Sequence, residues 1–181
     1  MIFTALPLAG SFLITPEPFS DDRGWFMRTY CKKDFEEIGH QGEWVQMNHS
    51  FTKSKGSLRG LHYQHPPHEE IKLIRCVAGE VYDVIVDLRK NSPTFLQHYA
   101  AKLSSANRQM MYVPGGFAHG FQTLSDDAEL IYLHSAFYTP SAESGLRYDD
   151  PALGIHWPIE ITTITDRDKG FLLIDQNFKG I

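Results

Sequence analysis

One short stretch of the chain concentrates side chains that can do chemistry. The stretch RGLHYQHPPHEEIKLIRC contains His62, His65 and His68, with an arginine before them and Lys72 after them. Three neighbouring histidines in a β-rich chain first suggest a metal site. On a strand, however, His62 and His65 point to opposite faces, and Gln64 stands where a second inward-facing ligand would be needed. The spacing is poor for a metal, and we expect none.

A second motif, PGGFAHGF, places His119 after a Pro114-x-Gly116 turn and near the start of an expected strand. Together the two motifs resemble the histidine motifs of cupin barrels, although the usual metal-binding pattern is incomplete. The remaining histidines are interpreted as structural or solvated: His40, His65, His68, His98, His134 and His156.

The surroundings of His62 favour proton abstraction next to a carbonyl. A neutral imidazole can act as the base, Lys72 supplies a cation, and Tyr132 and Tyr138 supply phenols. A carbon acid about ten pKa units weaker than imidazolium makes the proton transfer uphill by roughly 14 kcal/mol. A buried ammonium facing the enolate oxygen supplies ~3 kcal/mol or more, so Lys72 matters as much as the base. By composition alone, a surface lysine on a strand would be the more common interpretation of Lys72.

Strands must position these groups, because only one stretch has a helical pattern. In KKDFEEIGH, Asp34 can cap, Phe35 and Ile38 share a face, and Gly39 can end the turn. Elsewhere Val-, Ile- and Tyr-rich runs alternate with turn residues, which is typical of a sandwich, jelly roll or barrel. The clearest expected strands are 71–77, 81–89, 110–113 and 129–138.

The run 81–89 alternates in an informative way. Tyr82 and the alternate apolar residues after it form one face, whereas Asp83 and Asp87 point the other way. Two carboxylates on one face indicate either a wet cavity or the solvent side of a sandwich. The run alone does not choose between them.

Length and composition limit the classes of protein that remain. The 181 residues are 42% hydrophobic, carry a formal net charge of -5, and include two cysteines, which is too few for a disulfide framework. No basic stripe is present, so we expect neither a nucleic-acid nor a membrane partner. The apolar residues 1–16 lack Lys and Arg and are interrupted by Pro7 and Gly10, so we interpret them as the first strand of a cytoplasmic protein. We expect one domain over 1–181, with a C-terminal appendage from near Tyr148.

At the level of whole motifs the chain resembles the dTDP-4-dehydrorhamnose 3,5-epimerase family, whose members are cupin-like barrels. The resemblance implies an all-β fold: a cupin-like jelly-roll barrel with short helices and a C-terminal appendage. The motifs that carry it are DDRGWF (21–26), QMNHS (46–50), LRGLHYQ (58–64), KL (72–73), GEVYDVIVDLRKNSPTF (79–95), VPGGFAHGFQTL (113–124), IYLHSAFY (131–138), YDDPALGIHWP (148–158) and TDRD (165–168).

The resemblance also implies roles for individual residues. His62 would remove the protons that flank a sugar C4 ketone, and Asp168 would orient it. Lys72 would face the ketone oxygen, and Tyr132 would deliver a proton to the opposite face of the ring. Asp83 would lie near Lys72 or His119. The residues that fall at the nucleotide and sugar positions are Arg23, Arg28, Gln46, Asn48, Arg59, His119, Tyr138, Glu143 and Arg167.

These implied roles describe a cofactor-independent isomerase that acts on a nucleoside-diphosphate 4-keto-6-deoxyhexose. The main hypothesis is the dTDP-4-dehydro-6-deoxyglucose 3,5-epimerase type. Members of the family pair through strand exchange, so we expect a homodimer.

Three departures from the family pattern bear on the substrate. Arg28 stands where the family usually has Glu, Glu70-Ile71 replaces Gln-Gly before the lysine, and Arg167 replaces Lys before the last aspartate. These positions touch or neighbour the family's nucleotide site. We therefore expect the chemistry to be kept while the preferred base or sugar can differ.

Three alternatives stay open. One is a single-centre 3- or 5-epimerase for another keto-sugar. Another is a metal-dependent cupin oxygenase that uses His62, His65 or His68, and His119. The last is a sugar-nucleotide binding module without catalysis, against which the base and the opposed acid argue.

Overall fold

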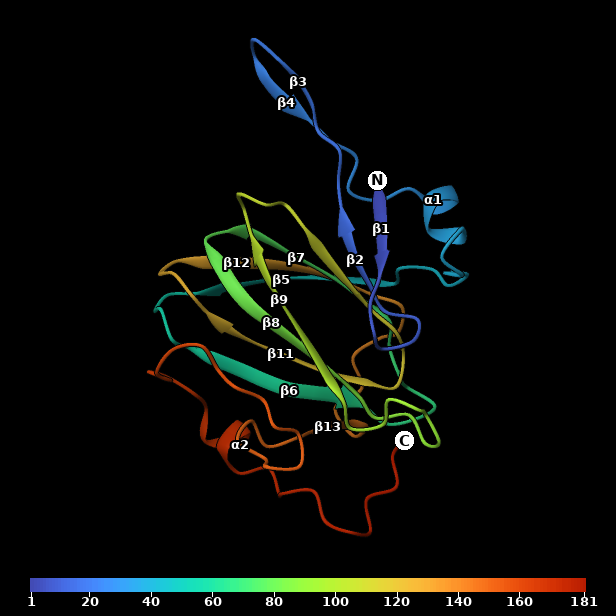
Figure 1. The fold of residues 1–181 in the computed structure, drawn as a ribbon, viewed down its shortest axis with the longest axis vertical. Helices are drawn as coiled ribbons and strands as arrows, with labels where there is room; N and C mark the ends of the chain where they lie inside the picture. Colours follow the sequence, from blue (N-terminus) through green and yellow to red (C-terminus); the bar gives the residue numbers. More distant parts are fainter.

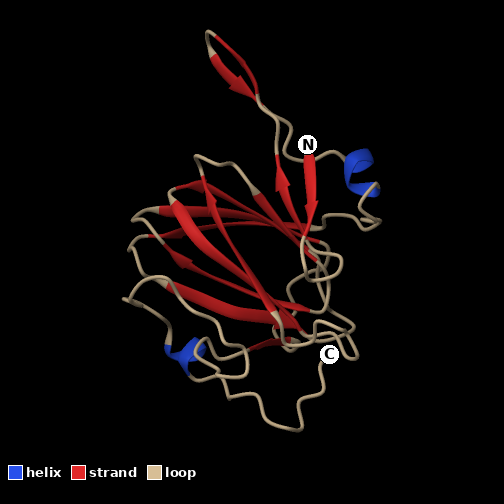
Figure 2. Ribbon diagram, viewed as in Figure 1, coloured by secondary structure: helices blue, strands red, loops and turns tan.

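The computed structural model describes residues 1–181 and consists mainly of two facing antiparallel sheets (Figures 1 and 2). The six-stranded sheet has the order β1 (Ile2–Ala5), β2 (Phe12–Thr15), β10 (Met110–Val113), β7 (Lys72–Ala78), β12 (Ala128–His134) and β5 (Gln46–Thr52). The five-stranded sheet has the order β13 (Glu143–Gly145), β6 (Leu58–Gln64), β11 (Phe117–Thr123), β8 (Glu80–Asp87) and β9 (His98–Ser104). The expected all-β, jelly-roll class is confirmed.

The main core lies between the two sheets. Ile74 and Cys76 of β7 and Val81 and Ile85 of β8 are fully buried in one cluster. Burial of apolar surface on this scale is the principal force that holds two sheets face to face.

Both faces of β8 are buried, so neither side of this strand is a solvent side. Asp83 and Asp87 point between the sheets and are fully buried. The opposite face, with Val84 and Val86, packs into a second cluster under the C-terminal segment. The interpretation of the two aspartates as a solvent-facing pair is therefore wrong, and each instead has a buried partner, described below.

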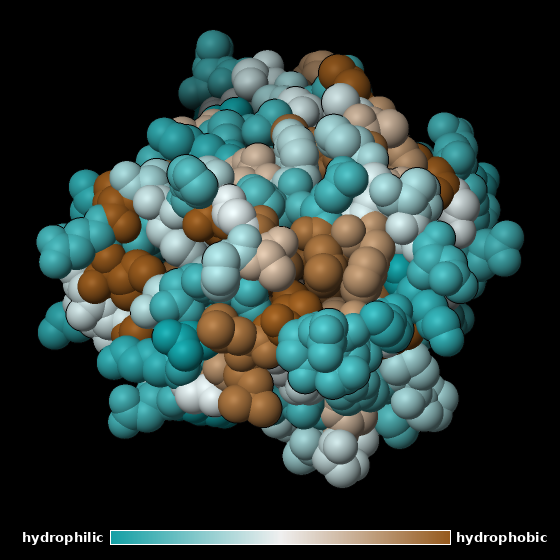
Figure 3. Space-filling model, turned by 60° about the horizontal axis from the view of Figure 1, so that its bottom comes forward, coloured by the Kyte–Doolittle hydropathy of each residue, from teal (hydrophilic) through white to brown (hydrophobic).

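The C-terminal segment covers the outer face of the five-stranded sheet, as the expected appendage. Leu153 is buried there, and Trp157, Ile174 and Phe178 pack around it. The segment runs below the sheets in Figure 1, and the molecular surface seen from this end alternates hydrophobic and hydrophilic patches (Figure 3). This cover explains why β8 is apolar on the side away from the main core.

The segment also contains a helix that the sequence pattern did not predict. Helix α2 (Asp166–Lys169) is only four residues long, and the Thr165 side chain caps it by accepting from the backbone N–H of Asp168 at 3.2 Å. One turn cannot show a hydrophobic period. The expectation of a single helix in the chain was wrong for this reason.

The expected helix near residue 32 is present as α1 (Lys32–Glu36), with a different start. Its N-cap is Cys31, which makes no side-chain capping bond, and Asp34 lies inside the first turn. The prediction that Asp34 caps the helix is therefore wrong. Phe35 is fully buried, and Gly39 adopts a φ of 84° just after the helix.

A small hairpin extends from the body. Strands β3 (Phe19–Asp21) and β4 (Gly24–Phe26) pair only with each other and project away from both sheets (Figure 1). Phe19 and Phe26 are 77% and 76% exposed. The Arg108 guanidinium lies 4.6 Å from the centre of the Trp25 ring and links the hairpin to the body. We call residues 19–26 the arm.

One strand, β12, ends earlier than expected. The chain predicted as one strand over 129–138 leaves the sheet after His134, and the Ser135 hydroxyl then accepts from the Ile71 N–H at 2.8 Å. This early departure carries the following residues to the rim of the cavity.

Neither helix has the length and apolar content that a membrane crossing requires.

Candidate active site

A polar cavity of about 300 Å³ opens between the two sheets. Most of its lining is polar or charged, and both sheets contribute to it. The lining residues are Gln46, Asn48, Ser50, Arg59, His62, Tyr63, Gln64, Glu70, Lys72, His119, Phe121, Tyr132, His134, Tyr138 and Glu143.

His62 is held at the cavity wall by a buried carboxylate. Its Nε2 lies 2.9 Å from Asp168 Oδ1, and the other oxygen of Asp168 accepts from the Gly60 N–H at 3.1 Å. Burial alone would raise the pKa of Asp168, but the hydrogen bond and charge of His62, with the Gly60 N–H and Arg167, hold it at about 2. Asp168 therefore stays ionised, orients the ring and stabilises an imidazolium.

Arg167 competes for the same ring nitrogen. Its guanidinium lies 2.9 Å from His62 Nε2, 2.9 Å from Glu143 and 3.3 Å from Asp168. A guanidinium only donates hydrogen bonds, so it can bond to Nε2 only when that atom carries no proton. Arg167 and Asp168 therefore favour opposite tautomers of His62.

Lys72 lies on the opposite wall beside a second carboxylate. Its Nζ is 3.0 Å from Glu70 Oε1, and Glu70 Oε2 is 2.7 Å from Nδ1 of His134. Burial alone would raise the pKa of Glu70, but the hydrogen bonds and charges of His134 and Lys72 hold it at about 2. The cavity thus contains an ammonium that is ion-paired on one side and faces open space on the other.

Tyr132 comes from β12, across the cavity from His62 on β6. Burial raises the pKa of its phenol, which therefore keeps its proton at neutral pH. The Ser50 hydroxyl lies 3.2 Å from the phenol oxygen. The phenol is placed as a proton donor on the wall that faces the imidazole.

His119 stands directly beside His62, since the two residues are register partners on β11 and β6. Its Nε2 lies 2.8 Å from Asp83, which is fully buried and has its other oxygen without a partner. This contact confirms the expectation that Asp83 lies near His119. Asp87 is elsewhere: it accepts from Arg89 at 2.7 Å and does not line the cavity.

The rim is formed by side chains of several elements, among them Tyr138, which the early end of β12 carries there. The Tyr138 hydroxyl donates to Glu143 at 2.8 Å, and its backbone N–H donates to Gln46 at 3.1 Å. Arg59 donates to the Thr52 hydroxyl at 3.0 Å. These side chains surround the mouth, where the larger part of a ligand would project.

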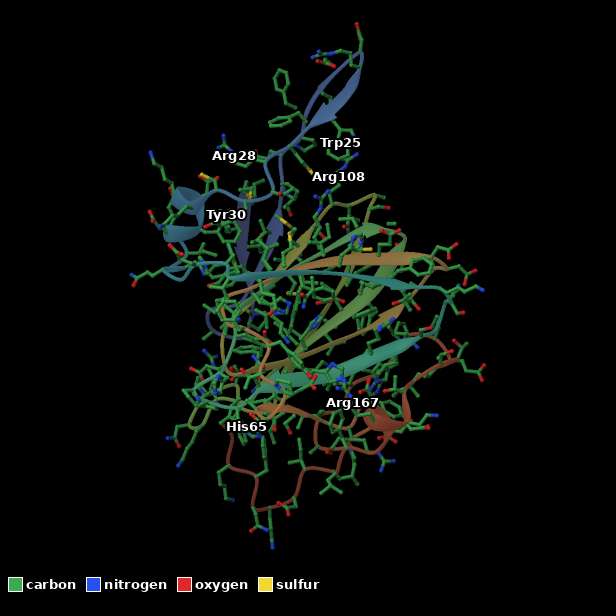
Figure 4. All side chains as sticks on the ribbon, turned by 180° about the vertical axis from the view of Figure 1, so that it is seen from behind. Trp25, Arg28, Tyr30, His65, Arg108 and Arg167 are labelled. Carbon is green, nitrogen blue, oxygen red and sulfur yellow. The ribbon has the colours of Figure 1, made fainter.

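Three of the expected binding residues do not line the cavity of their own chain. Arg167 is next to the cavity, where it contacts His62 and Glu143 of the lining. The other two are remote from it. Arg23 is on the arm and pairs with Asp21 at 2.6 Å, and Arg28 is exposed just beyond the arm. Figure 4 shows Arg28 and Trp25 toward the arm end, whereas Arg167 lies by α2 on the other side of the sheets. The arm projects outward, so the chain cannot bring either arginine to its own cavity in this conformation.

The structure adds residues that the sequence interpretation missed. His134, interpreted as structural or solvated, is 10% exposed and lines the cavity, so it is not a solvated histidine. The sequence identifies Glu70 only as a departure from the family pattern, and it does not indicate Ser50 or Phe121 as site residues. Because period 2 puts Tyr132 and His134 on the same face of a strand, the alternation itself could have indicated His134.

We find no group of three or more His, Cys, Asp or Glu side chains arranged to hold a metal ion. His62 and His119 are neighbours, but each is bonded to a different aspartate, Asp168 and Asp83 respectively.

Fold and site together define a class: a cupin-like jelly roll whose cavity holds a base, an ammonium and a buried phenol. The chain belongs to the dTDP-4-dehydrorhamnose 3,5-epimerase family, whose model matches residues 5–176.

Individual relatives agree with this membership. The chain is 44% identical to dTDP-4-dehydrorhamnose 3,5-epimerase of Shigella flexneri over 92% of both chains. It is 38% identical to dTDP-4-dehydrorhamnose 3-epimerase of Streptomyces niveus, covering 93% of this chain and 82% of that one. A Legionella pneumophila dTDP-6-deoxy-D-glucose-3,5-epimerase, solved with dTDP-4-keto-L-rhamnose, superposes with a TM-score of 0.90 at 38% identity and covers 95% of this chain and 92% of its own.

Proposed function

We propose that the protein is an isomerase that inverts C3 and C5 of a dTDP-linked 4-keto-6-deoxyhexose. One observation carries this proposal: His62 and Tyr132 line one cavity from opposite sheets, with Lys72 between a carboxylate and the open space. Inversion needs a base on one face of a sugar ring and an acid on the other. Family membership supplies the substrate class.

The reaction follows from these three groups. His62 takes the proton from the carbon next to the ketone, and its imidazolium is stabilised by Asp168. The electron pair moves onto the ketone oxygen, where the Lys72 ammonium donates a hydrogen bond to the enolate. Tyr132 then protonates the same carbon from the opposite face. The imidazolium and the phenolate return to neutral by proton exchange with water, and the second carbon follows in the same way.

The nucleotide diphosphate would occupy the mouth of the cavity. Gln46, Tyr138 and Glu143 lie there, and Arg59 can present a fork of N–H groups to phosphate. The Legionella relative solved with dTDP-4-keto-L-rhamnose supports a thymidine nucleotide as the natural probe.

The arm would act in a second copy of the chain. Its exposed phenylalanines project from the body and have no cover within their own chain. Burying them against a partner removes apolar surface from water, and the same step would carry Arg23 and Arg28 toward the partner's cavity. We therefore propose a homodimer in which each arm completes the other site.

Incubation with dTDP-4-keto-6-deoxyglucose in deuterated water tests the reaction. Inversion at both centres with deuterium at C3 and C5 is expected, followed by mass spectrometry and NMR. Absence of deuterium at both positions would overturn the proposal.

A second candidate is inversion at C3 only, which the similarity to the Streptomyces niveus 3-epimerase favours. The same experiment separates the two, because a 3-epimerase would place deuterium at C3 and leave C5 protonated.

A further inference from the structure

One backbone N–H and five polar side chains form one continuous hydrogen-bonded row along the wall of the six-stranded sheet. The row runs from the Tyr138 N–H to Gln46 at 3.1 Å, from Gln46 to Asn48 at 3.1 Å, and from Asn48 to His134 Nε2 at 3.2 Å. His134 Nδ1 then lies 2.7 Å from Glu70, whose other oxygen lies 3.0 Å from Lys72. The row therefore joins the rim of the cavity to the lysine inside it.

Each bond of the row has only one possible direction. A backbone N–H donates, so the Gln46 oxygen accepts and its NH₂ donates to the Asn48 oxygen. The NH₂ of Asn48 must then donate to Nε2 of His134, which leaves the ring proton on Nδ1 for Glu70. The network thus selects one neutral tautomer of His134.

We propose that Glu70 and His134 are positioning residues that aim the Lys72 ammonium at the ketone oxygen and couple it to the Gln46–Asn48 side of the cavity. The inference rests on the proposed function for what Lys72 does, and on the row of bonds for how it is held. Neither Glu70 nor His134 is required to touch the reacting atoms.

The burial of the three side chains supports this role. Lys72 and Glu70 are 9% and 11% exposed, and His134 is 10% exposed. A long, flexible lysine side chain without a fixed partner samples several rotamers. Here His134 holds the Glu70 carboxylate in place, and the carboxylate in turn fixes the position of the Lys72 ammonium. The Tyr132 ring stacks against His134 at 6.1 Å between ring centres, so the Glu70–His134 pair also borders the phenol that we propose as the acid.

A glutamine at position 70 cannot replace the carboxylate without a conflict. If its oxygen faces Lys72, its NH₂ meets the Nδ1 proton of His134, and the ring must move its proton to Nε2. The Nε2 proton then faces the NH₂ of Asn48, so two donors meet. Turning the side-chain amides of Asn48 and Gln46 around removes this clash, but it places the Gln46 NH₂ against the Tyr138 N–H, which is again a donor facing a donor. If the glutamine faces the other way, its NH₂ meets the lysine ammonium. Glu70→Gln therefore breaks the row at one point in every arrangement.

The first test is spectroscopic and does not depend on turnover. In protein labelled with ¹⁵N-histidine, with the His134 signals assigned by their loss in His134→Ala, the free enzyme should show the neutral ring protonated at Nδ1. Glu70→Gln should move the proton to Nε2, because the amide oxygen is expected to face the Lys72 ammonium and the NH₂ then faces the ring. A wild-type ring protonated at Nε2 would overturn the inference, even if the protein proves to be an epimerase.

The second test is kinetic. Glu70→Gln and His134→Ala should each lower kcat roughly ten- to hundredfold with little change in KM, because the electrophile is displaced rather than removed. The double variant should be no slower than the worse single variant, since both act through one clamp. Multiplicative losses, or unchanged kcat in both single variants, would contradict the proposal.

A matched control is Tyr112→Phe, which removes a 3.1 Å bond to another buried histidine, His40, outside the cavity. It should lower stability without changing kcat. If the wild-type protein does not turn over the dTDP-keto-sugar at all, the proposed function fails, while the tautomer measurement still decides the positioning role.

Discussion

The chemistry of the site depends on which atoms of single residues hold a proton. Asp168 remains a carboxylate well below neutral pH, so His62 can alternate between imidazole and imidazolium beside a fixed negative charge. The phenol of Tyr132 is in the reverse situation, since burial keeps it protonated. In the proposed mechanism, their surroundings, and not their types alone, set the two residues as base and acid.

His62→Ala should abolish deuterium exchange at both sugar carbons, because the variant lacks the proposed base. Loss of a general base lowers the rate by roughly 10² to 10⁴-fold. Exchange would be followed by NMR in deuterated water, and thymidine diphosphate binding by calorimetry should be largely retained. Exchange near the wild-type rate at either carbon would show that another residue is the base.

Tyr132→Phe should separate exchange from inversion. The base remains, so protons still leave the carbon, but the acid on the opposite face is lost and protons return on the side they left. Deuterium incorporation with little epimerised product is the expected pattern. Ser50→Ala is a useful control, because it removes only the 3.2 Å contact to the phenol and should have a smaller effect. Full inversion in the Phe variant would assign the acid role elsewhere, with Tyr138 the next candidate.

Residue types and spacing predict many of the side chains in this site, but not all of them. His62, Lys72 and His119 could be singled out because they stand in dense polar motifs on expected strands. The alternation of its strand could have indicated that His134 shares a face with Tyr132, but its role becomes clear only when Glu70 is seen beside it. Arg23 and Arg28 were assigned to the binding site by motif, and only the path of the backbone shows that their own cavity is out of reach.

At the scale of elements, the site depends on how closely β6 and β11 approach. A side chain at Gly60 would place its Cβ 2.6 Å from the Cα of Gly120 and 2.9 Å from the carbonyl oxygen of His119. Gly60 also has a φ of 119°, which side chains rarely adopt. This residue thus lets the strand that carries the base lie directly against the strand that carries His119.

Gly60→Ala should therefore destabilise the protein and disturb the base. Overpacking of this kind costs roughly 1 to 3 kcal/mol, and the Gly60 N–H that bonds Asp168 at 3.1 Å would shift with it. Chemical unfolding and kcat would be measured together, and both should fall. Gly154→Ala provides a comparison, because it also has a positive φ but no atom within 4 Å of its Cβ position. Its kcat should be unchanged. Equal kcat in wild type and Gly60→Ala would show that the close approach does not position the base.

Elements differed in how well they could be predicted. The strand expected at 110–113 is β10 with the same bounds, because a short apolar run between two turns leaves little choice. Helix α2 gave no periodic signal, since its stability comes from the Thr165 cap and its buried Asp168. The burial of both faces of β8 could not be predicted either, because the segment that covers one face lies about seventy residues further along the chain.

At the scale of the whole molecule, acid stability should follow the buried carboxylates. Burial raises the pKa of Asp87, but hydrogen bonds from Arg89, Ser92 and Thr94 bring it down from 3.8 to about 2. A lowered pKa means that the stabilisation is complete above pH 3.8 and is lost as the pH falls toward 2. Glu70 and Asp168 act in the same direction.

Asp87→Asn should lower the free energy of unfolding at neutral pH by about 1 to 3 kcal/mol and make its decline below pH 4 shallower. Urea unfolding at a series of pH values measures both. Asp87 does not line the cavity, so kcat at neutral pH should stay at the wild-type value. An acid slope as steep as that of the wild type would show that Asp87 is not a source of the pH dependence.

In the proposed dimer, the arm joins assembly to binding, which makes it a feature of the whole molecule. Phe19 and Phe26 expose most of their surface on a hairpin that pairs with no other strand of its chain. Burying one phenylalanine side chain contributes about 1.5 to 3 kcal/mol, so two arms with two rings each can hold a dimer together. Arg23 lies on the same hairpin, and its guanidinium pairs with Asp21 at 2.6 Å. A diphosphate could replace Asp21 as the partner of this guanidinium.

Replacing both Phe19 and Phe26 with Ser should therefore convert a dimer into a monomer and weaken binding of thymidine diphosphate in the same protein. Sedimentation measures the first effect and calorimetry the second. Arg23→Gln should weaken nucleotide binding while leaving the dimer intact, because it removes the charge and keeps the apolar rings. The two variants together separate assembly from binding. A double Ser variant that stays dimeric with unchanged affinity would show that the arm neither joins the copies nor reaches the partner's cavity.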